Sequence, residues 1–425
     1  MIQLTAARRA RAFFGLTPEI IAVSTATLFM NLGENLWRRF LPKYLQSLGA
    51  PVTAIGLFGT AEDFLDGVYQ YPGGWIADRY GRRAALLLLV SLTIVGYALF
   101  AVLPNWRFAF VALAFIMAWD AMASPTLFAV VGDALPREKR TMGFTVQAIL
   151  RRVPIVIAPT LGGVAIATLG LRDGVRLGIA ISVALALATL LVASRVRVPV
   201  IRDEKTVNVS HVWASFPDPL RWLLTSDIFI RTCEGMVDIF LVLYAIDVVG
   251  VNAAQFGILI AVQAATAMLI YIPAARIAEF TGKKPFVITT FCCFALMPLA
   301  VVWSSSFGWL VVAFMIGGLR EVGEPARKAF IVDLAAPSLR ARVVGLYYLV
   351  RSLAIAPAAL VGGLLWRISP QLPFYVASAI GVIGVVVFVS TVDEDQSNRR
   401  PLRFIAHALS RARPHGHSQR LRISM

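Results

Sequence analysis

Twelve apolar stretches follow one another along the 425 residues of the chain, separated by shorter polar segments. Each is about 20 residues or longer, which is enough for a helix to cross the ~30 Å hydrocarbon core of a bilayer. They are predicted at 18–47, 53–73, 84–103, 108–132, 142–169, 175–194, 221–249, 255–278, 286–304, 309–332, 343–368 and 373–391. Stretches of this kind predict an all-α polytopic membrane protein with about twelve transmembrane helices.

The composition excludes an ordinary soluble protein and argues against nucleic-acid binding. Hydrophobic residues make up 58% of the chain and charged residues 15%, with a mean hydropathy of +0.74. The formal charge of +16 comes from basic residues that cluster between the apolar stretches and in the tails, as expected of cytoplasmic loops. Cys233, Cys292 and Cys293 lie inside apolar stretches without disulfide or metal spacing. With no nucleophile–base spacing or phosphate-binding loop either, we expect no nucleic-acid partner, cofactor, metal or enzymatic activity.

The loop charges predict the topology. An even number of spans places both termini on one side, and the connections on that side carry nearly all the loop arginines and lysines, so this side is expected to be cytoplasmic. No cleavage site follows the basic residues Arg8, Arg9 and Arg11, so the first span is expected to be retained. The predicted location is the cell membrane, with a multi-pass chain and cytoplasmic termini.

The chain divides near its middle. Residues 195–220 form the only long polar break between apolar stretches. We therefore predict an N-terminal six-helix bundle over 1–194, a cytoplasmic linker over 195–220, a C-terminal six-helix bundle over 221–392 and a basic cytoplasmic tail over 393–425.

The two halves repeat each other at an offset of 200 to 201 residues, which aligns many polar and special positions. The matches include Glu34 with Glu234, Gly56 with Gly257, Pro72 with Pro273, Arg151 with Arg351, and Gly162-Gly163 with Gly362-Gly363. Parallel repeats related by an axis along the membrane normal bind substrate near the bilayer midplane, between the halves.

One loop carries a specific motif. Between the second and third stretches stand Gly74, Asp78, Arg79, Gly81, Arg82 and Arg83 at the spacing GxxxDRxGRR. This segment resembles the signature loop of the major facilitator superfamily, in which it acts as a conformational latch. A degenerate second copy spans 279–284, where Phe280 stands in place of Arg79. The segment from Ala158 to Gly163 partly resembles the antiporter motif of drug-exporting members.

Charged and polar residues line one face of four stretches, although charges at membrane depth are costly. On the first these are Asn31, Glu34, Asn35 and Arg38; on the second Glu62, Asp63, Asp66, Tyr69 and Gln70; on the seventh Asp227, Arg231, Glu234 and Asp238; on the tenth Arg320, Glu321, Glu324, Arg327 and Lys328. Such faces must line a water-filled cavity or the seam between the bundles. The family resemblance implies that the first, fourth, seventh and tenth helices line the cavity.

Some of these charges are expected to neutralise each other within a helix. Glu34 with Arg38, Asp227 with Arg231, and Arg320 with Glu324 stand four residues apart, the spacing of helical ion pairs. Asp120 is the lone carboxylate of the fourth stretch, and Arg320 is its repeat mate. We expect this pair to meet across the pseudo-twofold axis in at least one state.

Two sets of functional candidates follow from these positions. A carboxylate in a partly dry cavity tends to hold a proton, and a nearby arginine opposes this, so the two together can act as a proton switch. The proton-coupling candidates are Glu34, Glu234, Asp66 and Asp120. The substrate or gate candidates are Arg38, Arg151, Arg320, Glu324 and Arg351.

The resemblance implies a secondary active transporter that works by alternating access. We expect a monomer in the lipid bilayer that is coupled to protons and exports a small polar or charged organic solute. Proton symport or uniport for uptake is an alternative, as is a lipid flippase, which would need a lateral opening lined by apolar residues. A receptor that has lost transport is disfavoured by the retained loop motif and the many buried charges.

Overall fold

The computed structural model describes residues 18–103, 105–123, 137–195, 209–334 and 340–392, and these form helices without a strand. The all-α prediction is therefore confirmed for this part of the chain. The first half comprises α2 (Pro18–Asn35), η1 (Arg38–Phe40), α3 (Leu41–Ser47), α4 (Val52–Tyr80), α5 (Arg82–Val102), α6 (Phe108–Met117), η2 (Ala118–Met122), α8 (Arg137–Leu169) and α9 (Leu171–Ala193).

The second half repeats this order. It comprises α10 (Val209–Ala214), α11 (Asp218–Val237), η3 (Asp238–Phe240), α12 (Leu241–Leu243), η4 (Tyr244–Val248), α13 (Ala253–Thr281), α14 (Lys284–Val302), α15 (Phe307–Leu319), α16 (Glu324–Leu334), α17 (Arg340–Ile355), α18 (Ala358–Trp366) and α19 (Leu372–Thr391).

Two of the predicted spans are broken at the same place in each half. The span predicted at 18–47 changes to a 3₁₀ turn at Arg38–Phe40, and the span predicted at 221–249 does so at Asp238–Phe240. A glycine packs directly on each break. A Cβ on Gly162 would lie 1.8 Å from the carbonyl oxygen of Leu36, and one on Gly362 would lie 2.3 Å from that of Met236. Each break is thus held by the backbone of a neighbouring helix.

The spans predicted at 309–332 and 343–368 also differ from the structure, because each consists of two helices. Between α15 and α16, the backbone N–H of Gly323 donates to the hydroxyl of Thr290 at 2.6 Å, instead of to a carbonyl one turn earlier. Between α17 and α18 stands Pro357, which has no N–H to donate and disfavours helix in the residue before it.

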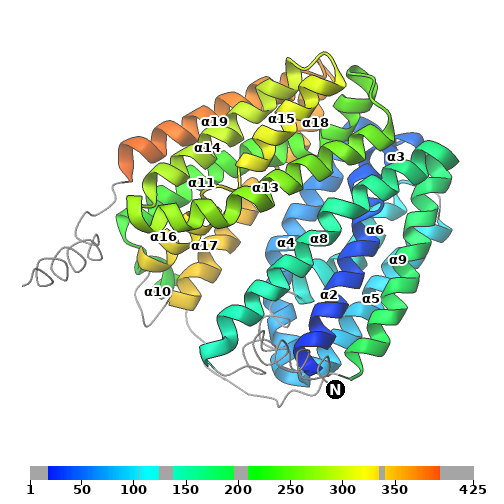
Figure 1. The fold of residues 1–425 in the computed structure, drawn as a ribbon, viewed down its shortest axis with the longest axis horizontal. Helices are drawn as coiled ribbons and strands as arrows, with labels where there is room; N and C mark the ends of the chain where they lie inside the picture. Colours follow the sequence, from blue (N-terminus) through cyan, green and yellow to red (C-terminus); the bar gives the residue numbers. More distant parts are fainter. Residues whose placement is uncertain (1–17, 104, 124–136, 196–208, 335–339, 393–425) are drawn as a thin grey trace, which may run out of the picture.

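The two halves meet along closely packed pairs of helices. A Cβ on Gly163 of α8 would lie 2.4 Å from the carbonyl oxygen of Ala253 at the start of α13, and one on Gly56 of α4 would lie 2.5 Å from that of Ala359 in α18. These contacts lie toward the end of the molecule that carries Gly49, Gly170 and Gly250, here called the outer end. In Figure 1 the halves approach each other at this end and their ribbons diverge toward the opposite, inner end.

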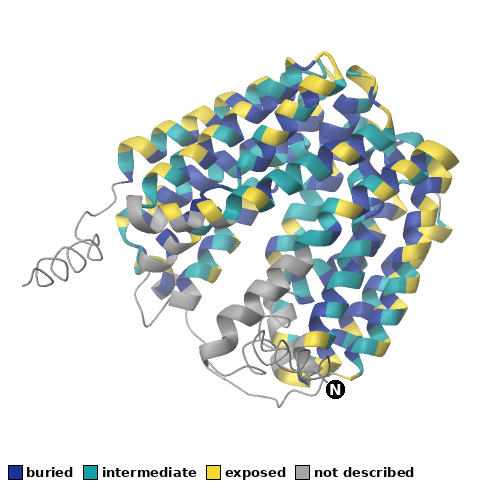
Figure 2. Cartoon of the chain, in the orientation of Figure 1, coloured by how far each residue is buried: buried dark blue, intermediate teal, exposed yellow. Residues whose placement is uncertain are grey.

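The outside of the helices suits a lipid environment. Large apolar residues such as Leu191, Leu269 and Val386 are exposed, whereas the faces inside each half are buried, as Figure 2 shows. Seven helical segments of the described chain are long and apolar enough to cross a membrane, among them α5, α9 and α19. Breaks or charges interrupt others, such as α2, α4 and α11. The chain is a multi-pass membrane protein.

Candidate functional site

In the first half, a single arginine joins three carboxylates from three elements. Arg38 is the first residue of the 3₁₀ turn η1, three residues beyond the end of α2. Its guanidinium forms ion pairs with Glu34 of α2, Glu62 of α4 and Asp120 of η2. The last of these stands in a π-helical turn, a local distortion often found at functional sites. We call these four residues the N-half cluster.

The N-half cluster is only partly enclosed. The side chain of Glu34 is 4% exposed, but those of Arg38 and Glu62 are 27% and 31% exposed. Charged groups in the middle of membrane spans cannot face lipid, so their exposed atoms must face a polar space.

Two more carboxylates stand beside this cluster on α4. Asp63 and Asp66 are partly buried, and neither forms an ion pair or hydrogen bond within the part of the chain that the structure describes. Asp63 faces the other half, because its Oδ2 would lie 3.6 Å from a Cβ on Gly235 of α11. The polar face predicted for the second span thus contains both paired and unpaired acids.

In the second half the arrangement is inverted, and a buried carboxylate joins several donors. Oδ2 of Asp227 accepts from Nη1 of Arg327 at 2.6 Å, from the hydroxyl of Tyr347 at 3.1 Å and from Nη1 of Arg351 at 3.4 Å. Both Asp227 and Arg327 are almost fully buried, at 0% and 1% exposure. Arg327 also binds Glu324 with two nitrogens. This hub connects α11, α16 and α17.

A second layer of ion pairs lies next to the hub. Arg231 binds Glu324 and also donates to Glu234 at 2.8 Å, and Nη1 of Arg320 lies 3.3 Å from Glu234. The guanidinium groups of Arg231 and Arg320 both stack on the ring of Phe294, at 4.9 and 4.8 Å. The C-half cluster is the set Asp227, Arg231, Glu234, Arg320, Glu324, Arg327, Tyr347 and Arg351.

The helical pairs expected from the sequence have mixed outcomes. Glu34 and Arg38 are paired, and Arg231 lies 3.8 Å from Asp227. The pair of Arg320 with Glu324 does not form, so this expectation is wrong. The helix breaks between the two residues, and each binds a different partner.

The expected contact between Asp120 and Arg320 is not made in this structure. Asp120 binds Arg38, whereas Arg320 binds Glu234, so each ion pair stays within one half. Lys328, expected on the polar face of the tenth span, is exposed.

The structure describes only part of the predicted latch. Gly81 connects α4 to α5 with φ 88° and ψ 153°, a conformation that is essentially restricted to glycine. Arg79 stacks on Trp75 with 5.2 Å between the guanidinium carbon and the ring centroid, and Arg83 is exposed. The side chains of Asp78, Phe280 and Arg151, and the surroundings of Gly74, lie outside the described residues.

Within the part of the chain that the structure describes, three ion pairs that the sequence did not predict join the two halves. Arg39 lies 3.2 Å from Asp238, Lys43 binds Asp247, and Arg152 lies 3.1 Å from Glu321. The first two join the broken helices that follow α2 and α11, toward the outer end. Asp238 and Glu321 were expected on polar faces, but their partners are charges that stand apart from those faces in the sequence.

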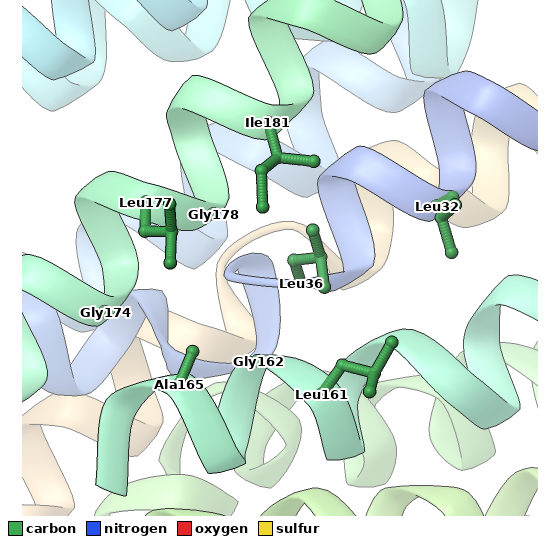
Figure 3. Close-up of a pocket in the computed structure, with 9 residues that line it drawn as sticks. All are labelled: Leu32, Leu36, Leu161, Gly162, Ala165, Gly174, Leu177, Gly178 and Ile181. Carbon is green, nitrogen blue, oxygen red and sulfur yellow. The ribbon is translucent and has the colours of Figure 1, made fainter. Parts of the chain in front are cut away.

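A separate apolar groove lies on the outside of the first half, between α2, α8 and α9 (Figure 3). Its volume is about 260 Å³. It is lined by Leu32, Leu36, Leu161, Gly162, Ala165, Gly174, Leu177, Gly178 and Ile181. Among the described residues no charged side chain lines it, so it is chemically distinct from the two charged clusters.

Comparisons with known proteins agree with this architecture. The family model described as Major Facilitator Superfamily matches residues 23–232 and 223–414. The bacillibactin exporter of Bacillus subtilis is 24% identical over 401 residues, covering 89% of this chain and 97% of the relative. An uncharacterized MFS-type transporter of Methanocaldococcus jannaschii is 22% identical over 366 residues, covering 84% and 91%.

The quinolone resistance protein NorA of Staphylococcus aureus is 22% identical over 165 residues, covering 39% of this chain and 42% of that protein. Among solved structures, the nucleoside transporter NupG superposes with a TM-score of 0.75 at 11% identity, covering 88% of this chain and all of that one. The human organic anion transporter MFSD10 superposes with a TM-score of 0.63 at 18% identity, covering 87% and 99%. The predicted fold of two six-helix halves is confirmed.

Proposed function

The chain belongs to the Major Facilitator Superfamily, and we propose that this transporter is a proton-coupled exporter of a small polar or charged organic compound. The observation that carries the proposal is the pair of charged clusters at mid-span, one in each half. Their partly exposed side chains require a polar space between the halves. Such a space at the repeat interface is where transporters of this architecture bind substrate.

The proton-coupling role is proposed for the N-half cluster. There Glu34, Glu62 and Asp120 share one arginine, with Asp63 and Asp66 nearby. An excess of carboxylates with little counter-charge is relieved by taking up protons. Glu34, Asp66 and Asp120 are therefore kept as proposed proton carriers.

Glu234 differs from its repeat mate in its neighbours. It lies between Arg231 and Arg320 and contacts both guanidinium groups. We assign it to holding these arginines rather than to carrying the proton. Arg38, Arg320, Glu324 and Arg351, together with Arg151, remain the proposed substrate or gate residues.

Alternating access is supported by where the halves touch. The glycine contacts and the pairs of Arg39 with Asp238 and of Lys43 with Asp247 join them toward the outer end. With the predicted topology, in which both termini are cytoplasmic, this is a state closed to the outside. Opening outward must separate these pairs, and the latch around Gly81 would hold the inner end.

Export rather than uptake is supported by two relatives whose names describe an exporter and a drug-resistance protein. Their substrates are not transferred to this chain. The proposed location is the cell membrane, with a monomer divided into bundles at 1–194 and 221–392, a linker at 195–220 and a tail at 393–425.

The experiment is proton flux in liposomes. Purified protein is reconstituted with a pH-sensitive dye inside, and a library of small organic compounds is screened for proton movement. Asp78→Asn, in the latch motif, serves as a variant expected to insert but not transport. Active compounds should move protons in wild type and not in the variant. Transport of library compounds without any proton movement would contradict the proposed proton coupling.

A lipid flippase is the second candidate, and the apolar groove of Figure 3 is the observation that favours it. The same liposomes can carry a fluorescent phospholipid whose inner-leaflet fraction is read with a membrane-impermeant quencher. Phospholipid exchange that depends on the protein, and that is slowed by Ala165→Trp in the groove, would support flipping. Exchange at the rate of protein-free liposomes would exclude it.

A further inference from the structure

The two halves present unequal charge to each other. Among the described residues, the polar face of the first half has five carboxylates and one arginine. These are Glu34, Glu62, Asp63, Asp66, Asp120 and Arg38. The C-half cluster has four arginines and three carboxylates. Two further acids of the second half, Asp238 and Glu321, are paired with Arg39 and Arg152 of the first half, so these pairs cancel in the comparison. A compound between them meets an acidic wall on one side and a basic wall on the other.

One arginine of the basic wall is held much more loosely than the rest. Arg327 and Arg231 each bind two carboxylates, and Arg320 binds a carboxylate and a backbone carbonyl. Arg351 instead has one long hydrogen bond, from Nη1 to Asp227 at 3.4 Å, and lies over the ring of Tyr348.

The unpaired edge of the Arg351 guanidinium, formed by Nε and Nη2, is the edge with which arginine binds carboxylates. Its Nε is buried and has no hydrogen-bond partner, and no hydrogen bond from its Nη2 occurs within the described chain. Two parallel N–H groups along one guanidinium edge are the geometry that binds a carboxylate with two hydrogen bonds. A buried donor without a partner is costly, so an anionic group at this edge would be stabilised.

The two helices that carry the loosely held groups touch each other. A Cβ on Gly67 of α4 would lie 2.9 Å from the Cβ of Ser352 on α17, so the helices touch there. Asp66 precedes the glycine in sequence, and Arg351 precedes the serine. Asp66 and Arg351 form no ion pair in this structure, and the hydrogen bond of Arg351 goes to Asp227. Asp63, one turn earlier, is likewise unpaired.

We propose that the transported compound is amphoteric, with a basic group received by Asp63 and Asp66 of α4 and an acidic group received by Arg351 of α17. This inference rests on the proposed transport function and specifies its substrate class. A basic group alone would leave the Arg351 edge unsatisfied, and an acidic group alone would face the unpaired carboxylates. Only a compound with both kinds of charge matches both walls.

The test uses binding to the purified full-length protein, measured as the shift of thermal unfolding with ligand concentration. The probes are matched triplets: phenylalanine, leucine and glycyl-phenylalanine, each with its methyl ester and its N-acetyl derivative. The ester removes the acidic group and the acetyl removes the basic one. At least one free compound should bind, and both blocked forms should bind about tenfold or more weakly.

Two variants locate the groups. In Arg351→Gln, the free compound and its ester should bind equally. In Asp66→Asn, the preference for the free compound over its N-acetyl form should fall by about tenfold. The preference for the free compound over its ester should stay the same. Arg351→Lys keeps the positive charge but removes the pair of parallel N–H donors, so it replaces Arg351→Gln as the test variant if the Gln variant does not fold. Arg176→Gln and Asp173→Asn change exposed residues of α9 and should change neither preference.

Esters or N-acetyl forms that bind as tightly as the free compounds would overturn the proposal, as would a complete lack of binding. The same holds if both preferences persist in the two variants. Failure of the amphoteric-substrate proposal can be told apart from failure of the proposed transport function. A library compound with a single kind of charge that moves protons in liposomes would overturn the amphoteric substrate and leave proton-coupled transport standing.

Discussion

The two halves share a backbone plan but arrange their charges in opposite ways. In the first half an arginine lies at the centre and three carboxylates surround it, with part of the cluster exposed. In the second half a fully buried aspartate lies at the centre, and arginines and a tyrosine surround it. Equivalent positions therefore have different electrostatic surroundings. Glu34 shares its one arginine with two other acids, whereas its mate Glu234 contacts two arginines, Arg320 and the Arg231 that also binds Glu324.

This comparison suggests a division of labour. A carboxylate-rich and partly exposed cluster can gain and lose protons without collapse of the fold. A buried network of matched charges is strongly coupled to packing, because removing one partner leaves another charge uncompensated. The second half should therefore tolerate charge removal less well than the first.

The largest expected effect is on stability, from Arg327→Gln. This change removes the buried guanidinium that Asp227 and Glu324 share, and breaking a buried pair by removing one partner costs about 3–5 kcal/mol. Thermal unfolding in detergent measures it. Arg38→Gln should lower the free energy of unfolding by less, because water and protons can reach the carboxylates that Arg38 binds. Arg221→Gln, in an exposed pair with Asp218, is the control and should cost about 0–1 kcal/mol. Equal losses at Arg327 and Arg38 would remove the distinction between the halves.

The next effect compares the two helix breaks. Gly162→Ala and Gly362→Ala each force a methyl group onto a backbone carbonyl, at 1.8 and 2.3 Å. Overpacking of this kind costs about 1–3 kcal/mol, and the Gly162 variant should lie at the upper end. Gly345→Ala is the control, because nothing lies within 4 Å of its Cβ position. It should be neutral or stabilising by up to about 1 kcal/mol. A destabilising Gly345→Ala with a harmless Gly162→Ala would contradict the packing described for the breaks.

A third comparison separates backbone strain from latch function. Gly81 and Gly170 adopt nearly the same conformation, at φ 88° and φ 87°, but only the first lies in the GxxxDRxGRR loop. Alanine at either position should destabilise by about 1–3 kcal/mol. Transport should slow at least tenfold in Gly81→Ala alone. Equal transport in the two variants, measured at equal protein in the same liposomes, would remove the latch assignment.

The smallest effect concerns the outer gate. The pairs of Arg39 with Asp238 and of Lys43 with Asp247 are partly exposed, so each contributes about 0.2–1 kcal/mol. Lys43→Gln should raise the outward-open population by up to about fivefold, read by spin-label distances across the outer end. Exchanging the charges in Lys43→Asp with Asp247→Lys should restore the distribution. An unchanged population in Lys43→Gln would show that the glycine contacts alone close this end.

Much of the fold could be predicted from the sequence, because span length and the repeat offset depend only on local composition. The spans around α5, α9 and α19 were predicted to within a few residues. The breaks were not predicted, since they depend on which helix packs on them. Gly162 was recognised as a repeat position, but its contact with Leu36 is a property of the folded halves.

The site was predictable as a set of residues but not as a set of pairs. The polar faces contained nearly all members of both clusters. The pairing rule of four residues failed at Arg320 and Glu324, because it assumes an unbroken helix. The gate pair of Lys43 with Asp247 depends on how the halves are placed, and repeat symmetry offers no guide, because these residues are not mates.

The most direct test of the central claim compares the two mated glutamates. Glu34→Gln and Glu234→Gln keep the shape of the side chain and remove its titration, and pH-gradient-driven accumulation of a transported compound is measured in liposomes. We predict that Glu34→Gln abolishes accumulation against a gradient and retains exchange of the compound. Glu234→Gln should retain gradient-driven accumulation at a reduced rate. Unchanged coupling in Glu34→Gln, or loss of coupling only in Glu234→Gln, would contradict the assignment of proton coupling to the first half.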